Sequence, residues 1–68
     1  MVEVQISTEF IKLDSFLKFT GAAVLGSEAK FYIQNGEVKV NGEVETQRGK
    51  KLYKDDEVEF QNEFYKIK

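Results

Sequence analysis

The chain has 68 residues, 12 acidic against 10 basic side chains, a net charge of −2, and neither cysteine nor histidine. These absences exclude disulfides, thiolate metal sites and histidine-based catalysis or metal binding. No apolar run approaches the roughly 20 residues that cross a bilayer, and residues 1–5 lack the basic and apolar regions of a signal peptide. We therefore expect one cytoplasmic domain over residues 1–68, a monomer with no metal, cofactor or membrane partner.

The charges are distributed unevenly along the chain. From Lys12 to Lys54 there are eight basic and five acidic residues, a net charge of +3, whereas the rest of the chain has seven acids and two lysines, a net charge of −5. A local basic patch can bind phosphate while the whole molecule stays anionic. The alternative is an ordinary solvated surface.

The first third of the chain predicts a strand followed by a short helix. Apolar and polar residues alternate over Val2–Ile6, which is typical of a half-buried strand. Phe10–Leu13 is expected to be extended and to lead into a helix capped by Asp14 or Ser15. Gly21 is expected to end this helix in a left-handed conformation.

The middle of the chain predicts a loop and a second helix. In the loop of residues 22–26, Val24 and Leu25 are expected to be buried. Ser27 is a favourable N-cap for a helix from Glu28 to about Gln34, with Ala29, Tyr32 and Ile33 on one face.

A hairpin is predicted after the strand Val38–Val40, because Asn41–Gly42 is a strong turn signal. A two-residue loop would place Val44 opposite a lysine. A three-residue loop, Asn41–Glu43, pairs Val40 with Val44 and keeps one face apolar, so we predict that register.

Two further strands, Glu57–Phe60 and Phe64–Ile67, are predicted on either side of a turn at residues 61–63. The fold class is therefore α+β, with two short helices packed on a small, mostly antiparallel β-sheet. Most aromatic residues follow core periodicity and are expected to be inside: Phe10, Phe16, Phe19, Phe31, Tyr32, Phe60, Phe64 and Tyr65.

Two segments could hold phosphate. The start of the helix at Ser27 offers free backbone N–H groups and the positive end of the helix dipole, with Lys30 one turn along. The alternative is that Ser27 only caps and Lys30 is solvated. The densest basic segment, Arg48-Gly49-Lys50-Lys51, is expected in a loop, although such clusters also occur on surfaces by chance.

Tyr53 directly follows the basic segment and could stack on a base or ribose. Catalysis is not expected, because the carboxylates of residues 55–57 lie in a turn with no histidine, cysteine or second cluster nearby. The serines have no base to activate them, and no Walker-type loop is present.

Five segments stand in unbroken order over about 50 of the 68 residues: Lys12-Leu13-Asp14, Gly21, Ser27-Glu28-Ala29-Lys30, Ile33 to Gly42, and Asp55-Asp56-Glu57-Val58. In this order they resemble the S-four RNA-binding domain, also called the alpha-L motif, with a core motif over residues 10–60. The length and the basic segment look closest to the small stand-alone YaaA/YbcJ-like bacterial members.

The resemblance implies a non-catalytic, ribosome-associated module that binds structured RNA, such as ribosomal or tRNA-like RNA, on a basic face of the two helices and the hairpin. By position it implicates Lys12, Ser27, Lys30, Asn41, Arg48, Lys50 and Lys51.

The sequence departs from the family pattern at three positions. Asp55 replaces the usual glycine before the late aspartate, Gln47 stands where relatives often carry arginine, and Gly26 alone replaces a Gly-Gly pair. The alternative function is a protein–protein interaction module that keeps the fold without RNA affinity. A β-grasp-like carrier is disfavoured because the sequence ends in Ile67-Lys68 rather than Gly-Gly.

Overall fold

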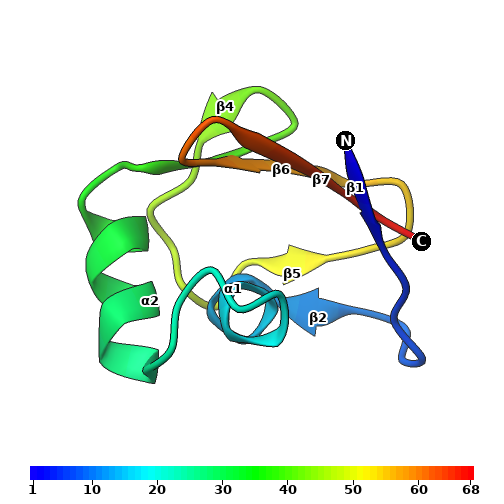
Figure 1. The fold of residues 1–68 in the computed structure, drawn as a ribbon, viewed down its shortest axis with the longest axis horizontal. Coiled ribbons are helices and arrows are strands. Elements are labelled where there is room, and N and C mark those ends of the chain that lie inside the picture. The colour runs from blue at the N-terminus through cyan, green and yellow to red at the C-terminus, as the bar shows by residue number, and fades with distance from the viewer.

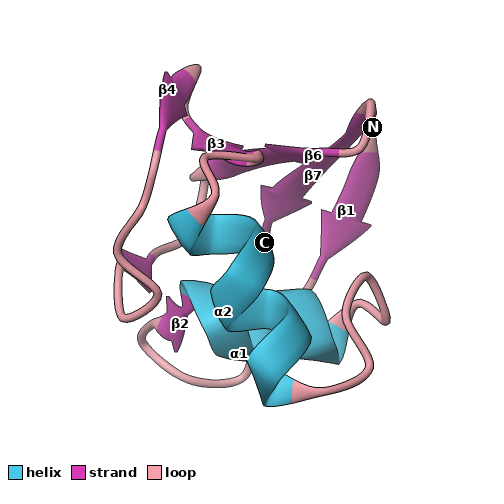
Figure 2. Cartoon of the chain, turned by 90° about the vertical axis from the view of Figure 1, so that its left-hand side faces the viewer, coloured by secondary structure: helices cyan, strands magenta, loops and turns pink.

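The computed structural model describes residues 1–68, which form a five-stranded sheet, a two-stranded sheet and two short helices (Figure 1). Both helices lie on one side of the larger sheet (Figure 2), so the predicted α+β class is confirmed. The elements are β1 (Val2–Val4), β2 (Ile11–Lys12), α1 (Leu13–Phe19), α2 (Gly26–Gln34), β3 (Val38–Val40), β4 (Glu43–Val44), β5 (Lys51–Leu52), β6 (Glu57–Phe60) and β7 (Glu63–Ile67).

The larger sheet has the strand order β1-β7-β6-β3-β4, and every neighbouring pair is antiparallel except β1 and β7. In that parallel pair Val2 lies opposite Tyr65 and Val4 lies opposite Ile67. The Lys68 N–H also donates to the Val4 carbonyl at 2.8 Å. Strands β1 and β7 therefore lie side by side. The alternation of apolar and polar residues within each strand does not reveal this pairing.

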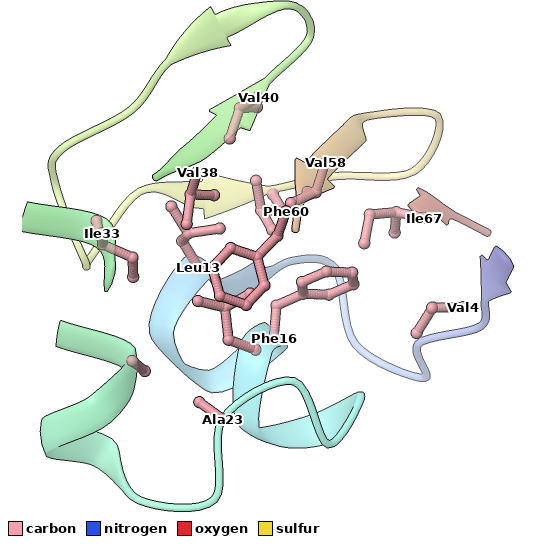
Figure 3. Close-up of a cluster of buried hydrophobic side chains, with 13 residues drawn as sticks. Val4, Leu13, Phe16, Ala23, Ile33, Val38, Val40, Val58, Phe60 and Ile67 are labelled. Atoms are coloured by element: carbon pink, nitrogen blue, oxygen red, sulfur yellow. The ribbon is translucent and has the colours of Figure 1, made fainter. Parts of the chain in front are cut away.

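The core lies between the larger sheet and the helices (Figure 3) and contains thirteen buried residues, all apolar. Phe16 of α1 is fully buried and meets the Tyr65 ring edge-on, with 5.6 Å between the ring centroids. Ala29 and Ile33 of α2 are also fully buried, as their helical spacing predicted. No polar or charged side chain is buried, so apolar contact and backbone hydrogen bonds stabilise the fold.

Helix α1 begins without a side-chain cap, so the predicted cap at Asp14 or Ser15 is wrong. Instead, the N–H groups of Leu13 and Asp14 donate to the carbonyls of Lys50 (2.9 Å) and Arg48 (3.0 Å). Backbone groups from a distant loop thus satisfy the open end of the helix. At the other end Gly21 has φ +83°, which confirms its left-handed conformation.

Helix α2 begins at Gly26 with Leu25 in the N-cap position, so the predicted N-cap at Ser27 is also wrong. The Glu28 carboxylate accepts the N–H groups of Val24 (3.0 Å) and Leu25 (3.1 Å). A glutamate in the third helical position can accept hydrogen bonds in this way from backbone N–H groups that have no partner within the helix. Ser27 therefore lies inside the first turn.

Several apolar residues expected to be buried are exposed. In the α1–α2 connection, Val24 is 80% and Leu25 59% exposed, whereas Ala23 is buried. The Ala23 N–H donates to the Leu17 carbonyl, which holds Ala23 against the core. The expectation of burial is also wrong for three aromatic residues, which are exposed: Phe19, Phe31 and Phe64.

The β3–β4 hairpin has a two-residue loop, so the predicted three-residue register is wrong. Asn41 and Gly42 both have positive φ, +52° and +87°, as a type I′ turn requires. Lys39 consequently lies opposite Val44. Both residues of β4 are exposed, so burial does not constrain the register and the turn preference of Asn-Gly decides it.

The β6–β7 turn is likewise shorter than expected. Gln61 and Asn62 have φ +51° and +64°, and Glu63 belongs to β7 rather than to the turn.

Candidate nucleic-acid interface

The small sheet places two lysines opposite each other. In the antiparallel pair of β2 and β5, Ile11 lies opposite Leu52 and Lys12 opposite Lys51. Leu52 is fully buried and Ile11 packs against the core. Because successive side chains alternate between the faces of a strand, Lys12 and Lys51 point outward, and both are exposed.

The loop before β5 adds two more cations. The hydrogen bonds from the start of α1 to the carbonyls of Arg48 and Lys50 hold this loop next to Lys12. We call Lys12, Arg48, Lys50 and Lys51 the basic cluster. Arg48 and Lys50 lie in the predicted loop, but Lys51 belongs to strand β5.

No side chain of the basic cluster forms an ion pair with a carboxylate. The one ion pair in the structure joins Glu3 Oε1 of β1 to Nζ of Lys68, the residue after β7, at 3.2 Å. Cations that lack an internal partner remain available to an external anion. The cluster has the charge and exposure that phosphate binding needs.

Lys50 also borders a hollow beside β4. Its lining includes Asn41 and Lys50 together with the carboxylates of Glu43 and Glu45. The hollow therefore brings Asn41 and Lys50 together, but its lining contains both positive and negative side chains. The exposed outer pair of Lys12 and Lys51 is the more favourable place for an anion.

The Asn41 side chain is engaged inside the protein. Its Nδ2 donates to Asp56 Oδ1 at 3.1 Å, and its Oδ1 accepts the Glu57 N–H at 2.9 Å. The other oxygen of Asp56 accepts the Tyr53 N–H at 2.8 Å. Asn41 thus joins the β3–β4 turn to the segment between β5 and β6.

The same segment explains one departure from the family pattern. Asp55 has φ +77°, a left-handed conformation that glycine adopts without a steric penalty. The turn keeps this geometry with aspartate, and the Asp55 N–H donates to the Ile67 carbonyl at 2.8 Å.

Ser27 and Lys30 lie on α2, away from the strand pair that carries Lys12 and Lys51. Both are exposed. The Glu28 carboxylate accepts hydrogen bonds from the backbone N–H groups just before this helix. A phosphate at Ser27 would therefore approach a negative charge. The helix start is less favourable for anions than the sequence suggested.

Neither helix is long and apolar enough to span a membrane. No group of three potential metal-ligating side chains lies together.

Residues 4–68 match the family model described as the S4 domain. The chain belongs to the S4 domain family. A curated relative, the "Probable ribosome maturation protein RlbA" of Bacillus subtilis (strain 168), is 41% identical over 58 residues, which cover 85% of this chain and 82% of the relative. The resemblance inferred from the sequence to the S-four family of small proteins is confirmed.

A solved structure shows the same fold. The 30S ribosomal protein S4e from Thermoplasma acidophilum superposes with a TM-score of 0.66 at 22% identity, covering 88% of this S4 domain. The match covers only 32% of the ribosomal protein, so this S4 domain spans about a third of its length.

The sequence reading missed one residue next to the basic cluster of this S4 domain. Phe10 was expected in the core, yet its ring lies 4.7 Å from Lys51 Nζ and 6.0 Å from the Tyr53 ring. The sequence carries a weak signal for this arrangement in two short segments, residues 10–12 and 51–53. Each has an apolar residue at its centre that points into the core, so its two neighbours point outward. Only their pairing shows which side chains meet.

The Asn41–Asp56 contact gives a stability prediction for this S4 domain. Asn41→Gly removes the side chain but tolerates the positive φ, and should lower the free energy of unfolding by about 1 kcal/mol. Asp56→Ala should cost about 1–2 kcal/mol because two N–H donors lose their acceptor. In urea denaturation the double variant should lose less free energy of unfolding than the sum of the two single variants, and the difference should be about 0.5–1 kcal/mol. Additive losses would contradict the contact.

Proposed function

We propose that this S4 domain is a non-catalytic module that binds structured RNA through the basic cluster. The observation that carries the proposal is the convergence of cations from two distant segments. Lys12 faces Lys51, and the loop with Arg48 and Lys50 is tied to the start of α1. All four side chains are exposed, and none pairs with a carboxylate.

The arrangement suits phosphate contacts better than base reading in a duplex. The major groove of an A-form helix is too narrow for side chains, so proteins recognise RNA duplexes by backbone and shape. Arg48 can bind a phosphate through two N–H groups, and the lysines supply point charges. The acids concentrated in β6, β7 and the turn before β6 lie outside the cluster, which favours one binding face.

The relatives support a ribosomal RNA target. One is named as a probable ribosome maturation protein and the other as a protein of the 30S subunit. We propose that residues 1–68 act as one cytoplasmic unit, as a monomer without cofactor, on ribosomal or similarly folded RNA.

The remaining site predictions take secondary places in this proposal. Lys30 and Ser27 would form a second contact on α2, limited by the Glu28 carboxylate. Asn41 would act as a positioning residue, because its side chain holds the segment that leads from β5 to β6.

Binding of a structured ribosomal RNA fragment across a salt series tests the proposal. We expect log K to fall linearly with log salt, with a slope of about −2 to −4 if two to four phosphates are contacted. Binding should need no nucleotide or other organic cofactor. Affinity that does not change with salt, or no binding to any folded RNA, would overturn the proposal.

Exposed apolar residues favour a second candidate, a protein-interaction module. Phe19 (62% exposed) ends α1, Leu25 (59%) precedes α2, and Phe31 (61%) lies on α2. Pull-down with and without nuclease discriminates the candidates. Partners that survive RNA digestion and are lost with Phe31→Ser would support protein interaction, whereas partners lost with the RNA support the first proposal.

A further inference from the structure

The outer face of the β2–β5 pair combines aromatic and basic side chains. Lys12 and Lys51 share this face because the flanking pair, Ile11 and Leu52, points into the core. Continuing the same register places Phe10 opposite Tyr53, and their ring centroids lie 6.0 Å apart at an interplanar angle of 49°. Two aromatic rings and two ammonium groups therefore occupy one surface.

The two rings differ in what remains open to a ligand. Lys51 Nζ lies 4.7 Å from the centroid of the Phe10 ring, so the lysine covers one side of that ring. Phe10 itself is only partly exposed. Tyr53 is 44% exposed and has no such cover. Phe10 supports the Tyr53 ring and positions Lys51, while Tyr53 offers the open surface.

The main chain of Tyr53 is held in place. Its N–H donates to Asp56 Oδ2 at 2.8 Å, and Asp56 Oδ1 is held by Asn41 Nδ2 at 3.1 Å. A ring on an anchored backbone loses little conformational freedom when it binds a ligand. The position of Tyr53 is set by the protein before any partner arrives.

We infer that Tyr53 stacks on one unpaired base of the bound RNA, while Lys51 and Lys12 hold the adjoining phosphates. This inference rests on the proposed function and specifies its target as a paired stem next to an unpaired nucleotide. Bases within a duplex are stacked on each other, whereas an unpaired base presents a free surface to an aromatic ring. The neighbouring lysines provide the charge that such a nucleotide carries on its backbone.

The test compares two RNAs with the same stem sequence and the same number of phosphates. In one RNA an internal loop stays unpaired and contains 2-aminopurine, a fluorescent adenine analogue, and in the other RNA the same positions are paired. The folded wild-type protein should bind the looped RNA about tenfold more tightly than the paired RNA. Stacking on Tyr53 should also change the 2-aminopurine fluorescence.

Three variants separate stacking from other effects. Tyr53→Leu should abolish the preference for the looped RNA and the fluorescence change, while keeping the affinity and salt slope for paired RNA. Tyr53→Phe should retain both. The matched control is Phe64→Leu, since Phe64 is 46% exposed but lies in β7 of the larger sheet. It should behave as wild type.

The outcomes distinguish this inference from the function on which it rests. Equal affinity for the two RNAs, or an unchanged fluorescence signal with the wild-type protein, overturns stacking and leaves phosphate binding intact. No binding to either RNA overturns both. Circular dichroism would reveal whether Tyr53→Leu folds; if it does not, the inference still requires that both wild type and Tyr53→Phe prefer the looped RNA and change its fluorescence.

Discussion

Replacing Lys12 and Lys51 together by alanine is expected to weaken RNA binding about 30-fold. The two side chains lie opposite each other on the exposed face of the β2–β5 pair. A lost phosphate contact on a surface costs roughly 1 kcal/mol, and two such losses give this factor. The salt slope should also become shallower by about one unit for each contact.

The matched control is the pair Lys39→Ala and Lys66→Ala, which removes the same charge from the larger sheet. Lys39 lies opposite Glu59, and Lys66 lies opposite Glu57. RNA affinity should change by less than about threefold in this control, because long-range effects of net charge are screened in salt. Equal losses in both pairs would mean that binding follows net charge and not the basic cluster.

Unfolding should not account for the loss in the first pair. Like charges placed directly opposite each other in a sheet are destabilising, so removing both lysines relieves repulsion. The contact of Lys51 with the Phe10 ring is lost at the same time, which offsets part of the gain. We expect the melting temperature to stay within about 4 °C of the wild-type value.

Phe16→Ala is expected to have the largest effect on stability. Phe16 is fully buried between α1 and the larger sheet and contacts the Tyr65 ring. Truncating a buried phenylalanine costs about 3–5 kcal/mol, while a domain of this size has a total stability of only about 3–10 kcal/mol. The melting temperature, measured by circular dichroism, should fall by at least about 12 °C.

The same helix provides the control. Phe19 lies three residues later in α1 but is 62% exposed. Phe19→Ala should therefore lower the free energy of unfolding by less than about 1 kcal/mol in urea. If both substitutions had similar effects, the described packing of α1 against the sheet would be contradicted.

The fold class could be predicted because its signals are local. Alternation marked the strand of Val38 and Val40, and the spacing of Ala29 and Ile33 marked the buried face of α2. The ends of the helices could not be predicted in the same way. Helix α1 is completed by the carbonyls of Arg48 and Lys50, which lie more than 30 positions along the chain.

The hairpin register failed for a related reason. The prediction assumed that Val44 would be buried, but β4 is an exposed edge strand. Without burial, the preference of Asn-Gly for a two-residue turn outweighs the alternation of apolar residues.

The sequence proposed residues for the candidate site but could not give their arrangement in space. Lys12 belongs to the first of the family segments, whereas Arg48–Lys51 was singled out as the densest basic segment. The register of β2 with β5, which places Lys12 against Lys51 and Phe10 near Tyr53, depends on a pairing between segments about 40 residues apart. No periodicity within either segment encodes that pairing.

During synthesis, β1 leaves the ribosome long before its partner β7 has been made. Residues 2–4 and 65–67 are the most widely separated segments that pair in this fold. Closing so long a loop costs more entropy than forming the α1–α2 or β3–β4 contacts, and contacts of large sequence separation slow folding. The backbone groups of β1 therefore stay unpaired until β7 has been made and can reach them, so the larger sheet is completed late in folding.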